Sequence, residues 1–260
     1  MSESVKGMVK EKVAGVPNLR TSGENFILAC SGCQEPIIVR LILEALEELK
    51  IDDMAIGIYG IGCTTGFMMG VTNLDCVVNP HGRGPDVATG VKRSSPENIV
   101  FTVQGDGDLL GIGAGALVGA LTRSEKITIF LSNNTNYGTT GGQMAPTTLV
   151  GQVTTTCTEG RDPRLAGYPT HAAELVAGFK GAAYSARGAL ISPAHFSQAK
   201  KYVKTALQKQ IDNVGLSLVE ILTACPTNWH MSPLDSLKWI EEKMIKEFPL
   251  GEFKNVDKIE

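Results

Sequence analysis

The sequence predicts an α/β fold in which a largely parallel sheet carries helices on both faces. From Cys30 onward, short apolar and β-branched runs alternate with helical patterns, and each such run ends in a polar or glycine-rich turn. The 260 residues suffice for one well-buried core and contain no linker, internal repeat or low-complexity stretch. We therefore expect a single domain over 1–260, with a segment of about 1–24 and a C-terminal helix of about 233–260 as extensions.

The first helix is expected over Glu35–Lys50, because Pro36 lies near its start and apolar residues recur there at helical spacing. The expected strands are short and apolar, as buried parallel strands are. They cover Met54–Tyr59, Asp75–Val78, Ile99–Gln104, Ile127–Ser132 and Leu216–Leu222. Further helices are expected over Leu109–Leu121, His171–Phe179, Pro193–Gln210 and Pro233–Glu247.

Charge and hydropathy exclude several classes of function. The formal net charge of −3 and the pI near 5.9 argue against a surface that binds nucleic acid. The first residues lack the apolar run of a secretory signal, and no stretch is apolar enough to span a membrane. We therefore expect a cytoplasmic protein. There the six cysteines would indicate metal or redox chemistry rather than disulfides.

Two polar motifs follow neighbouring expected strands. The turn Gly105-Asp106-Gly107-Asp108 comes after one strand, and Asn133-Asn134 comes after the next. An Asp-Gly pair alone is commonest in ordinary turns. The carboxyl ends of adjacent parallel strands lie side by side, however, so this order brings Asp106 and Asn134 to one edge of the sheet. Their oxygens suit Mg²⁺ that also holds phosphate, and the helix start between them favours an anion.

Four cysteines occupy turns at the same expected edge: Cys30 and Cys33 in a CxxC turn, Cys63 after the first strand and Cys225 after the last. Their residue types allow an iron-sulfur cluster, a zinc site or unligated thiols. The scattered spacing differs from the paired knuckles of a zinc ribbon. Cys76 is expected to be a small buried side chain on a strand. Cys157 lies in a long loop. We expect this loop to come near the active site, and we do not expect Cys157 to be a ligand.

These motifs resemble two known patterns. The GDG and NN pair resembles the motif of thiamine diphosphate enzymes. Together with CSGC, GIGC, PHGRGPDVATGVK, NNTNYGTTGGQMAPTT and CPTNW, it resembles the β subunit of 2-oxoacid:ferredoxin oxidoreductases from about Cys30 to Trp229. The resemblance implies a thiamine diphosphate-binding fold with Mg²⁺ and a [4Fe-4S] cluster. One departure is CSGCQ, where that family often has Cys-Pro-Gly-Cys-Gly.

The resemblance also implies roles for individual residues. Mg²⁺ would be held by Asp106, Asn134 and the main-chain oxygen of Asn136. The cluster would be held by Cys30, Cys33, Cys63 and Cys225. The other residues expected to contact the cofactor are His81, Cys63, Thr64, Gly105, Gly107, Asp108, Gly138 and Thr139. His81 would donate to the diphosphate or to a developing oxyanion. The remaining histidines carry no motif and are expected in helix caps, on the surface or in packing: His171, His195 and His230.

The implied activity is the coenzyme A-dependent oxidative decarboxylation of a 2-oxoacid to acyl-CoA and CO₂, with electrons passed to ferredoxin. No activating glutamate is assigned in this chain, so an α subunit with a pyrimidine-binding domain should supply it, with γ and δ (ferredoxin-like) subunits as further candidates. Branched-chain 2-oxoacids and 2-oxoglutarate are the expected substrates, and aryl 2-oxoacids stay open. The alternatives are a non-redox thiamine diphosphate decarboxylase or synthase subunit, and an electron-transfer scaffold subunit.

Overall fold

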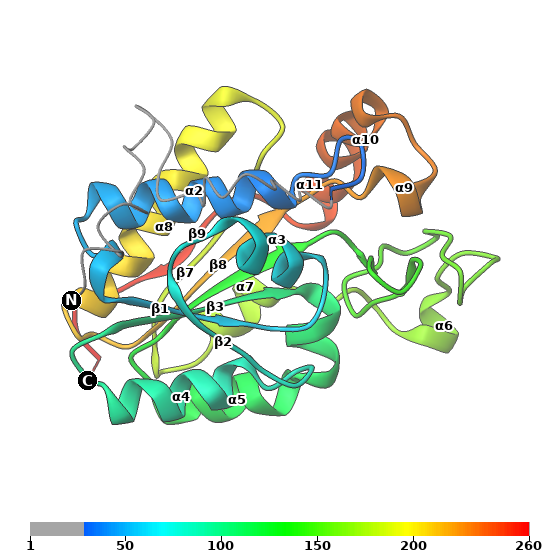
Figure 1. The fold of residues 1–260 in the computed structure, drawn as a ribbon. Helices are drawn as coiled ribbons and strands as arrows, with labels where there is room; N and C mark the ends of the chain where they lie inside the picture. Colours follow the sequence, from blue (N-terminus) through cyan, green and yellow to red (C-terminus); the bar gives the residue numbers. More distant parts are fainter. Residues whose placement is uncertain (1–28, 260) are drawn as a thin grey trace, which may run out of the picture.

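A computed structural model describes residues 29–259 (Figure 1). Its main sheet has the strand order β2-β1-β3-β4-β8-β7-β9, and all neighbouring pairs are parallel except β7 with β9. A short antiparallel pair follows β4. The strands are β1 Ala55–Tyr59, β2 Asp75–Val78, β3 Ile99–Gly105, β4 Thr128–Asn133, β5 Asn136–Tyr137, β6 Gln143–Met144, β7 Ala182–Ala189, β8 Leu216–Leu222 and β9 Gly251–Asn255. The expected strands and the α/β class are thus confirmed.

Helices cover both faces of the sheet, as the sequence predicts (Figure 1). One face carries α2 Glu35–Glu48, α3 Cys63–Val71 and α8 Pro193–Ile211. The other carries α4 Gly84–Ser94, α5 Ala114–Thr122 and α7 Ala172–Ala177. Because side chains alternate along a strand, Phe101 and Phe130 pack under the first set of helices, whereas Ile129 and Leu131 pack under the second. The core therefore has two layers, one on each side of the sheet.

The helix after the Gly-Asp-Gly-Asp turn does not begin as an ordinary α-helix. Residues Gly107–Ile112 form a π-helical turn, η2, and α5 follows from Ala114. Asp106 precedes η2, and its side chain accepts a hydrogen bond from the Gly107 amide at 2.9 Å. Such π turns are rare and occur frequently at functional sites. This irregularity lies directly beside the expected magnesium ligand.

The C-terminal expectation is wrong in part. Helical structure continues from Pro233 only to Glu247, through α10 Pro233–Trp239, a π turn η3 Ile240–Met244 and α11 Ile245–Glu247. The chain then passes Pro249 into β9, which pairs antiparallel with β7, so the expected helix over 233–260 ends early. Strand β7 was not expected either, because its sequence AAYSARGA is rich in small residues, although every residue in it is buried.

Cys76 was expected to be buried and is exposed instead. It lies on β2, the outermost strand on its side of the described sheet, and all four residues of that strand are exposed. A strand with one neighbour lacks the cover that a central strand has. The helix α4 after this strand was not among the helices expected from the sequence. The segment of about 1–24 lies outside the described residues.

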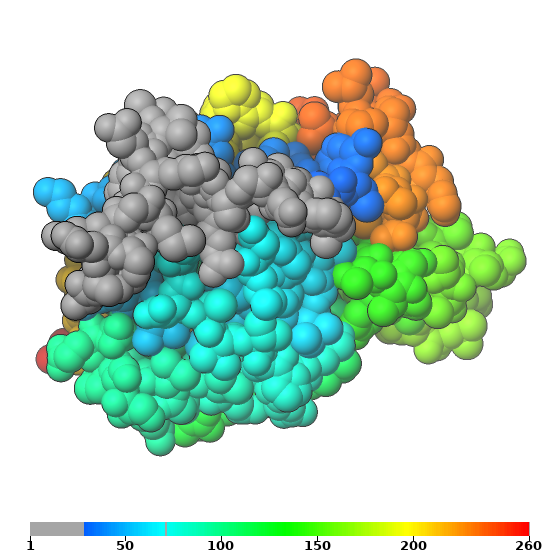
Figure 2. Space-filling view, in the orientation of Figure 1, coloured from blue at the N-terminus to red at the C-terminus, as the bar shows by residue number. Residues whose placement is uncertain are grey.

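The C-terminal helices and a loop over residues 148–170, which we call the projecting loop, form the end of the molecule that is orange and green in Figure 2. A small third core joins them to the sheet through Leu149, Leu222, Ile240, Met244 and Phe248. The helix over Pro233–Glu247 therefore packs on its own chain. Among the described residues, the helices are all too short or too polar to cross a membrane.

Candidate active site

The strand order places a topological switch point between β1 and β3, because the chain leaves β1 toward β2 on one side and continues from β3 toward β4 on the other. Ligands of open α/β sheets bind outside the carboxyl ends of strands at such a point. The turns after β1, β2, β3, β4 and β8 carry the expected site residues, and these turns lie at this edge. We call it the cofactor edge.

Asp106 is buried at the cofactor edge, with 1% of its surface exposed. One carboxylate oxygen accepts from the Gly107 amide, and the other accepts from the hydroxyl of Thr147. Burial raises the pKa of Asp106 to about 7, against the lowering effect of these hydrogen bonds and with a further rise from the nearby Glu35. A carboxylate in this position is costly without a counter-charge, so a bound cation would stabilise it.

The loop Asn133–Asn136 faces Asp106 from the end of β4. The side-chain oxygen of Asn134 accepts from the Asn136 amide at 3.2 Å, and its main-chain oxygen accepts from Trp229 Nε1 at 3.2 Å. Thr135 between them has a positive φ of 59°, which turns the chain sharply. The side-chain oxygen of Asn136 is buried and has no partner. Buried polar atoms normally have partners, so this one is open to a ligand from outside the chain.

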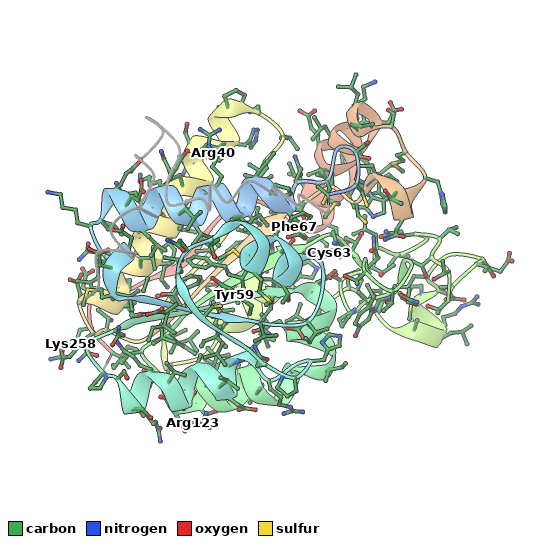
Figure 3. The ribbon with its side chains drawn as sticks, viewed as in Figure 1. Arg40, Tyr59, Cys63, Phe67, Arg123 and Lys258 are labelled. Carbon is green, nitrogen blue, oxygen red and sulfur yellow. The ribbon has the colours of Figure 1, made fainter. Side chains whose placement is uncertain are left out.

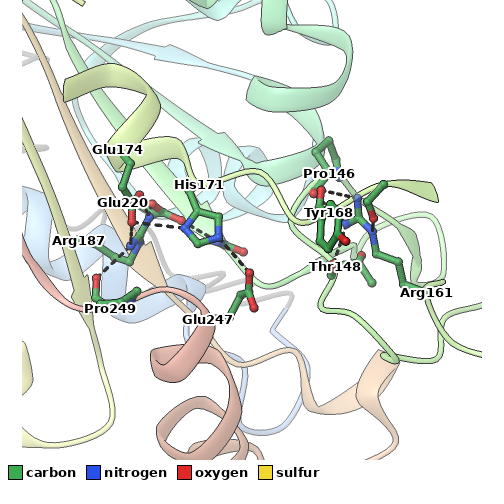
Figure 4. A network of polar contacts seen from close by, with 12 residues as sticks. Pro146, Thr148, Arg161, Tyr168, His171, Glu174, Arg187, Glu220, Glu247 and Pro249 are labelled. Carbon is green, nitrogen blue, oxygen red and sulfur yellow. Dashed lines mark hydrogen bonds and ion pairs between the residues drawn. The ribbon is translucent and has the colours of Figure 1, made fainter. Parts of the chain in front are cut away.

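A buried ionic network is connected to the asparagine loop, Asn133–Asn136, and Figure 4 shows its members Arg187, Glu174 and Glu220. Asn133 donates from Nδ2 to Glu220 at 2.7 Å, and Glu220 also accepts from Arg187 Nε at 2.8 Å. Arg187 and Glu220 are fully buried, and Arg187 continues to Glu174 and to the main-chain oxygen of Pro249. The loop that carries Asn134 is therefore tied to β7, β8 and the C-terminal segment.

Asp108 holds the turn after β2, which is part of the cofactor edge. It accepts from the Gly82 amide at 2.7 Å, contacts His81 Nδ1 and accepts from Gln104 Nε2 at 2.6 Å. Both carboxylate oxygens are thus engaged within the protein. His81 lies edge-on to Tyr137, with ring centroids 6.2 Å apart. Because Nδ1 contacts Asp108, the other ring nitrogen of His81, Nε2, is the atom that would contact a cofactor.

Cys33 and Cys63 lie close enough to other cysteines of the proposed cluster for these to affect their pKa values. Burial raises the pKa of Cys33 to about 12, with added rises from Glu35, Cys63 and Cys225. Burial likewise raises the pKa values of Cys63 and Cys225, and Cys30 contributes to the shift at Cys63. Within residues 29–259, however, no three His, Cys, Asp or Glu side chains meet closely enough to hold a metal ion in the arrangement seen.

Polar contacts join the cysteines to the loop after β4. Cys63 begins α3 (Figure 3), and its Sγ lies 3.0 Å from the hydroxyl of Thr139. Asn228 donates from Nδ2 to Cys225 Sγ at 3.3 Å and to the main-chain oxygen of Gly138 at 2.9 Å. Gly138 and Thr139 therefore lie between the cysteines and Asn134, and the buried Thr64 follows Cys63. The structure brings the two predicted sites to one edge.

The other singled-out residues lie in supporting positions. His171 precedes α7 and bonds to Glu247 Oε1 at 2.9 Å, and His195 accepts from or donates to Ser192 in the first turn of α8. His230 ends α9 Pro226–Trp229 in the left-handed region, so His171 and His230 occupy helix caps, whereas His195 lies within the first turn of α8. Cys157 lies in the projecting loop and donates its amide to Thr154 O at 3.1 Å.

One guanidinium holds that projecting loop in shape. Arg161 is 5% exposed, and its guanidinium donates to main-chain oxygens (Figure 4). Its acceptors are the carbonyls of Ala145, Pro146, Thr148, Ala166, Gly167 and Tyr168. The loop begins just after Thr147, which bonds to Asp106, so its path also fixes one wall of the cofactor edge. Sequence reasoning missed Arg161, Thr147 and Glu35, since none belongs to a charged or metal-binding motif.

Comparisons with known proteins agree with this geometry. The family model of the thiamine pyrophosphate enzyme C-terminal TPP binding domain matches residues 60–221, the part of the chain from the turn after β1 to β8. The chain is 42% identical over 228 residues to the ketoisovalerate oxidoreductase subunit VorA of Methanothermobacter thermautotrophicus, covering 87% of this chain and 47% of that protein. It is 33% identical over 213 residues to the 2-oxoglutarate synthase subunit KorB of Archaeoglobus fulgidus, covering 82% of this chain and 75% of that protein.

A solved 2-oxoglutarate:ferredoxin oxidoreductase from Magnetococcus marinus has the same fold, with a TM-score of 0.78 at 22% identity over 95% of this chain and 87% of that chain. Our chain spans about half the length of VorA and three quarters of KorB. It belongs to the thiamine pyrophosphate enzymes, in the family of 2-oxoacid:ferredoxin oxidoreductase β subunits. The resemblance stated from the motifs is thereby confirmed.

Proposed function

We propose that this chain is the thiamine diphosphate- and iron-sulfur-carrying β subunit of a 2-oxoacid:ferredoxin oxidoreductase that forms acyl-CoA and CO₂. The observation that carries the proposal is the placement of the Asp106 and Asn134 loops beside the turns of Cys63 and Cys225, which Thr139, Gly138 and Asn228 join to the loop after β4. A cofactor site alone would suit many reactions. A cysteine group beside it suits removal of electrons one at a time.

Mg²⁺ would be held by Asp106, Asn134 and Asn136, and the diphosphate would lie against Gly105, Gly107, Gly138 and Thr139. The buried carboxylate of Asp106, which a bound cation would stabilise, fits this group, and the proposed ligand atom of Asn136 is its main-chain oxygen. Asp108 would act through His81, by holding the ring and its neighbouring amide in place. Cys63 and Thr64 would contact the cofactor from the start of α3.

Thiamine diphosphate, when bound, supplies the electron-withdrawing ring that stabilises the negative charge left as CO₂ departs from a 2-oxoacid. The residues of this chain would then orient and shield that chemistry. Asp108 fixes the His81 ring, and His81 holds or accepts a proton at Nε2. The buried loop around Asn134 excludes water from the diphosphate. The activating glutamate and much of the substrate pocket would come from a partner α subunit.

The [4Fe-4S] cluster would be held by Cys30, Cys33, Cys63 and Cys225. Burial raises the thiol pKa values of Cys33, Cys63 and Cys225, so these sulfurs are protonated in the metal-free chain, and iron would replace the protons with a counter-charge. Electrons would leave toward a ferredoxin in the cytoplasm, and γ and δ subunits would complete the assembly.

A branched-chain 2-oxoacid is the proposed substrate. The relative with 42% identity carries ketoisovalerate in its name, whereas the KorB relatives are 31–33% identical.

The test is anaerobic purification of the chain with its partner subunits, followed by iron, sulfide and thiamine analysis and an assay against a panel of 2-oxoacids. We expect about four irons per chain and CoA-dependent reduction of a one-electron acceptor, fastest with branched-chain substrates. Iron near zero, or zinc in its place, would exclude the redox function. Thiamine retention with CO₂ release but without acceptor reduction would instead support the non-redox decarboxylase. Iron without thiamine would support the electron-transfer scaffold.

A further inference from the structure

The side chain directly after the CxxC turn makes two long-range contacts. Gln34 is 4% exposed, and its Nε2 donates to the main-chain oxygen of Leu190 at 2.8 Å. Its Oε1 accepts from the Ala224 amide at 2.9 Å. Leu190 follows β7, and Ala224 directly precedes Cys225. One amide group therefore connects the turn that carries Cys30 and Cys33 to the backbone beside the fourth cysteine.

The CxxC turn itself is rigid. The Cys33 amide donates to Cys30 O at 3.0 Å, and Gly32 has a φ of 78°. A Cβ at Gly32 would lie 2.6 Å from Cβ of Pro233, so only glycine fits against the start of α10. A turn fixed in this way moves as a unit. Its position relative to Cys225 then depends on the contacts at its end.

Two neighbouring side chains at the end of the turn reach different strands. Glu35 accepts from the Ser132 hydroxyl at 2.6 Å and is thereby tied to β4. Gln34 reaches the ends of β7 and β8. Of these two, Gln34 contacts the backbone of the residue bonded to Cys225. Loss of the Gln34 contact would separate the CxxC turn from the segment after β8 that carries Cys225. The contact between Glu35 and β4 would remain.

We propose that Gln34 is a positioning residue, which sets the placement of the Cys30–Cys33 turn relative to Cys225 and thereby the geometry and reduction potential of the cluster. This inference rests on the proposed function. It assigns a role to one of the two residues, Ser31 and Gln34, by which CSGCQ departs from the pattern stated for related chains. Cluster potentials respond to burial and to hydrogen bonds around the sulfurs, so a shift of two ligands against the others changes them.

The test compares Gln34→Leu with Gln210→Leu in the anaerobically purified complex. Gln210 is a matched control, because it is 2% exposed and its amide also bridges main-chain groups, Val100 N at 2.7 Å and Val100 O at 2.8 Å. Its contacts lie at the start of β3, at the opposite end of that strand from the cofactor edge. We expect both variants to unfold at lower temperature. The electron paramagnetic resonance spectrum and midpoint potential of the cluster should shift only in Gln34→Leu, which should also lose iron several-fold faster in air.

Thiamine content should stay at the wild-type level in both variants. If Gln34→Leu does not fold, Gln34→Gly removes the amide at a helix N-cap, where glycine is well tolerated, and the same spectral shift is expected. Cluster properties in the Gln34 variant equal to those of Gln210→Leu would overturn the inference. A wild-type complex that lacks iron would overturn the proposed function and this inference together.

Discussion

The hydroxyl of Tyr137 donates to the main-chain oxygen of Gly107 at 3.1 Å, and its ring covers the position where a Cβ at Gly107 would lie. Residue 107 must therefore be glycine for Tyr137 to keep its place between the π turn and His81. This contact joins the turn after β3 to β5, and so links the two halves of the proposed diphosphate site.

Gly107→Ala should therefore weaken cofactor binding strongly. The added methyl displaces the Tyr137 ring and with it the loop that carries Asn134 and Asn136, so we expect a loss of at least about tenfold in thiamine diphosphate affinity, or roughly 1.4 kcal/mol. Isothermal titration calorimetry in the presence of Mg²⁺ would measure this affinity. Gly115→Ala is the control, because a Cβ there meets nothing within 4 Å. Equal affinities in the two variants would contradict the packing argument.

Glu220→Gln should destabilise the fold and loosen the asparagine loop. An amide in place of the carboxylate leaves Arg187 with one counter-charge fewer and turns one donor toward Arg187 or Asn133. Breaking a buried pair costs about 3–5 kcal/mol, so urea unfolding should show a loss of this order. Arg40→Ala, which removes an exposed i,i+4 pair with Glu44, should cost less than about 0.5 kcal/mol. A cost for Glu220→Gln as small as that would show that the network is not structural.

Cofactor binding should depend on pH through Asp106. Burial raises its pKa to about 7 in the metal-free chain, so below pH 7 a proton competes with Mg²⁺ for the same oxygens. Mg²⁺-dependent retention of thiamine diphosphate should fall as the pH drops through 7, approaching about tenfold per pH unit below the pKa. Equilibrium dialysis between pH 5 and 8 would measure it.

The stability of the metal-free fold should depend on pH in the opposite direction to cofactor binding. Because the folded-state pKa of Asp106 lies above its unfolded value of 3.8, the metal-free fold should lose stability as the pH rises toward 7. Glu35, whose pKa burial also raises to about 7, adds to this trend. Asp106→Asn cannot ionise, so the trend in metal-free stability should become shallower in this variant, and its weak cofactor binding should not vary with pH. Unchanged profiles would rule out Asp106 as the titrating ligand.

Cys225→Ser and Cys76→Ser should separate the two kinds of cysteine. Cys225 is one of the four proposed cluster ligands, whereas Cys76 is exposed on β2, the outermost described strand on its side of the sheet. Iron and sulfide content and the visible spectrum of the anaerobic complex should fall in Cys225→Ser and stay at the wild-type level in Cys76→Ser. Loss of the spectrum in both variants would mean that the ligand set is wrong.

The sequence predicted the parallel strands that carry the site because each is a continuous apolar run followed by a polar or glycine-rich turn. It missed β7, whose small residues give no strand signal, and β9, which depends on pairing with β7. Asp106 and Asn134 could be predicted as metal ligands, because carboxylate and amide oxygens suit Mg²⁺ and both residues follow neighbouring strands. Gln34, Glu35 and Thr147 could not, because their roles arise only from contacts with residues far along the chain.

Arg161 gives the projecting loop a frame made of carbonyl groups, which every amino acid possesses. Replacement of the outward side chains, such as the exposed Val153, Leu165 and Tyr168, would leave those acceptors in place. The surface beside the cofactor edge can therefore diverge in sequence while the backbone keeps its course. Related enzymes could in this way acquire new substrate or subunit preferences through a loop whose shape depends on a single arginine.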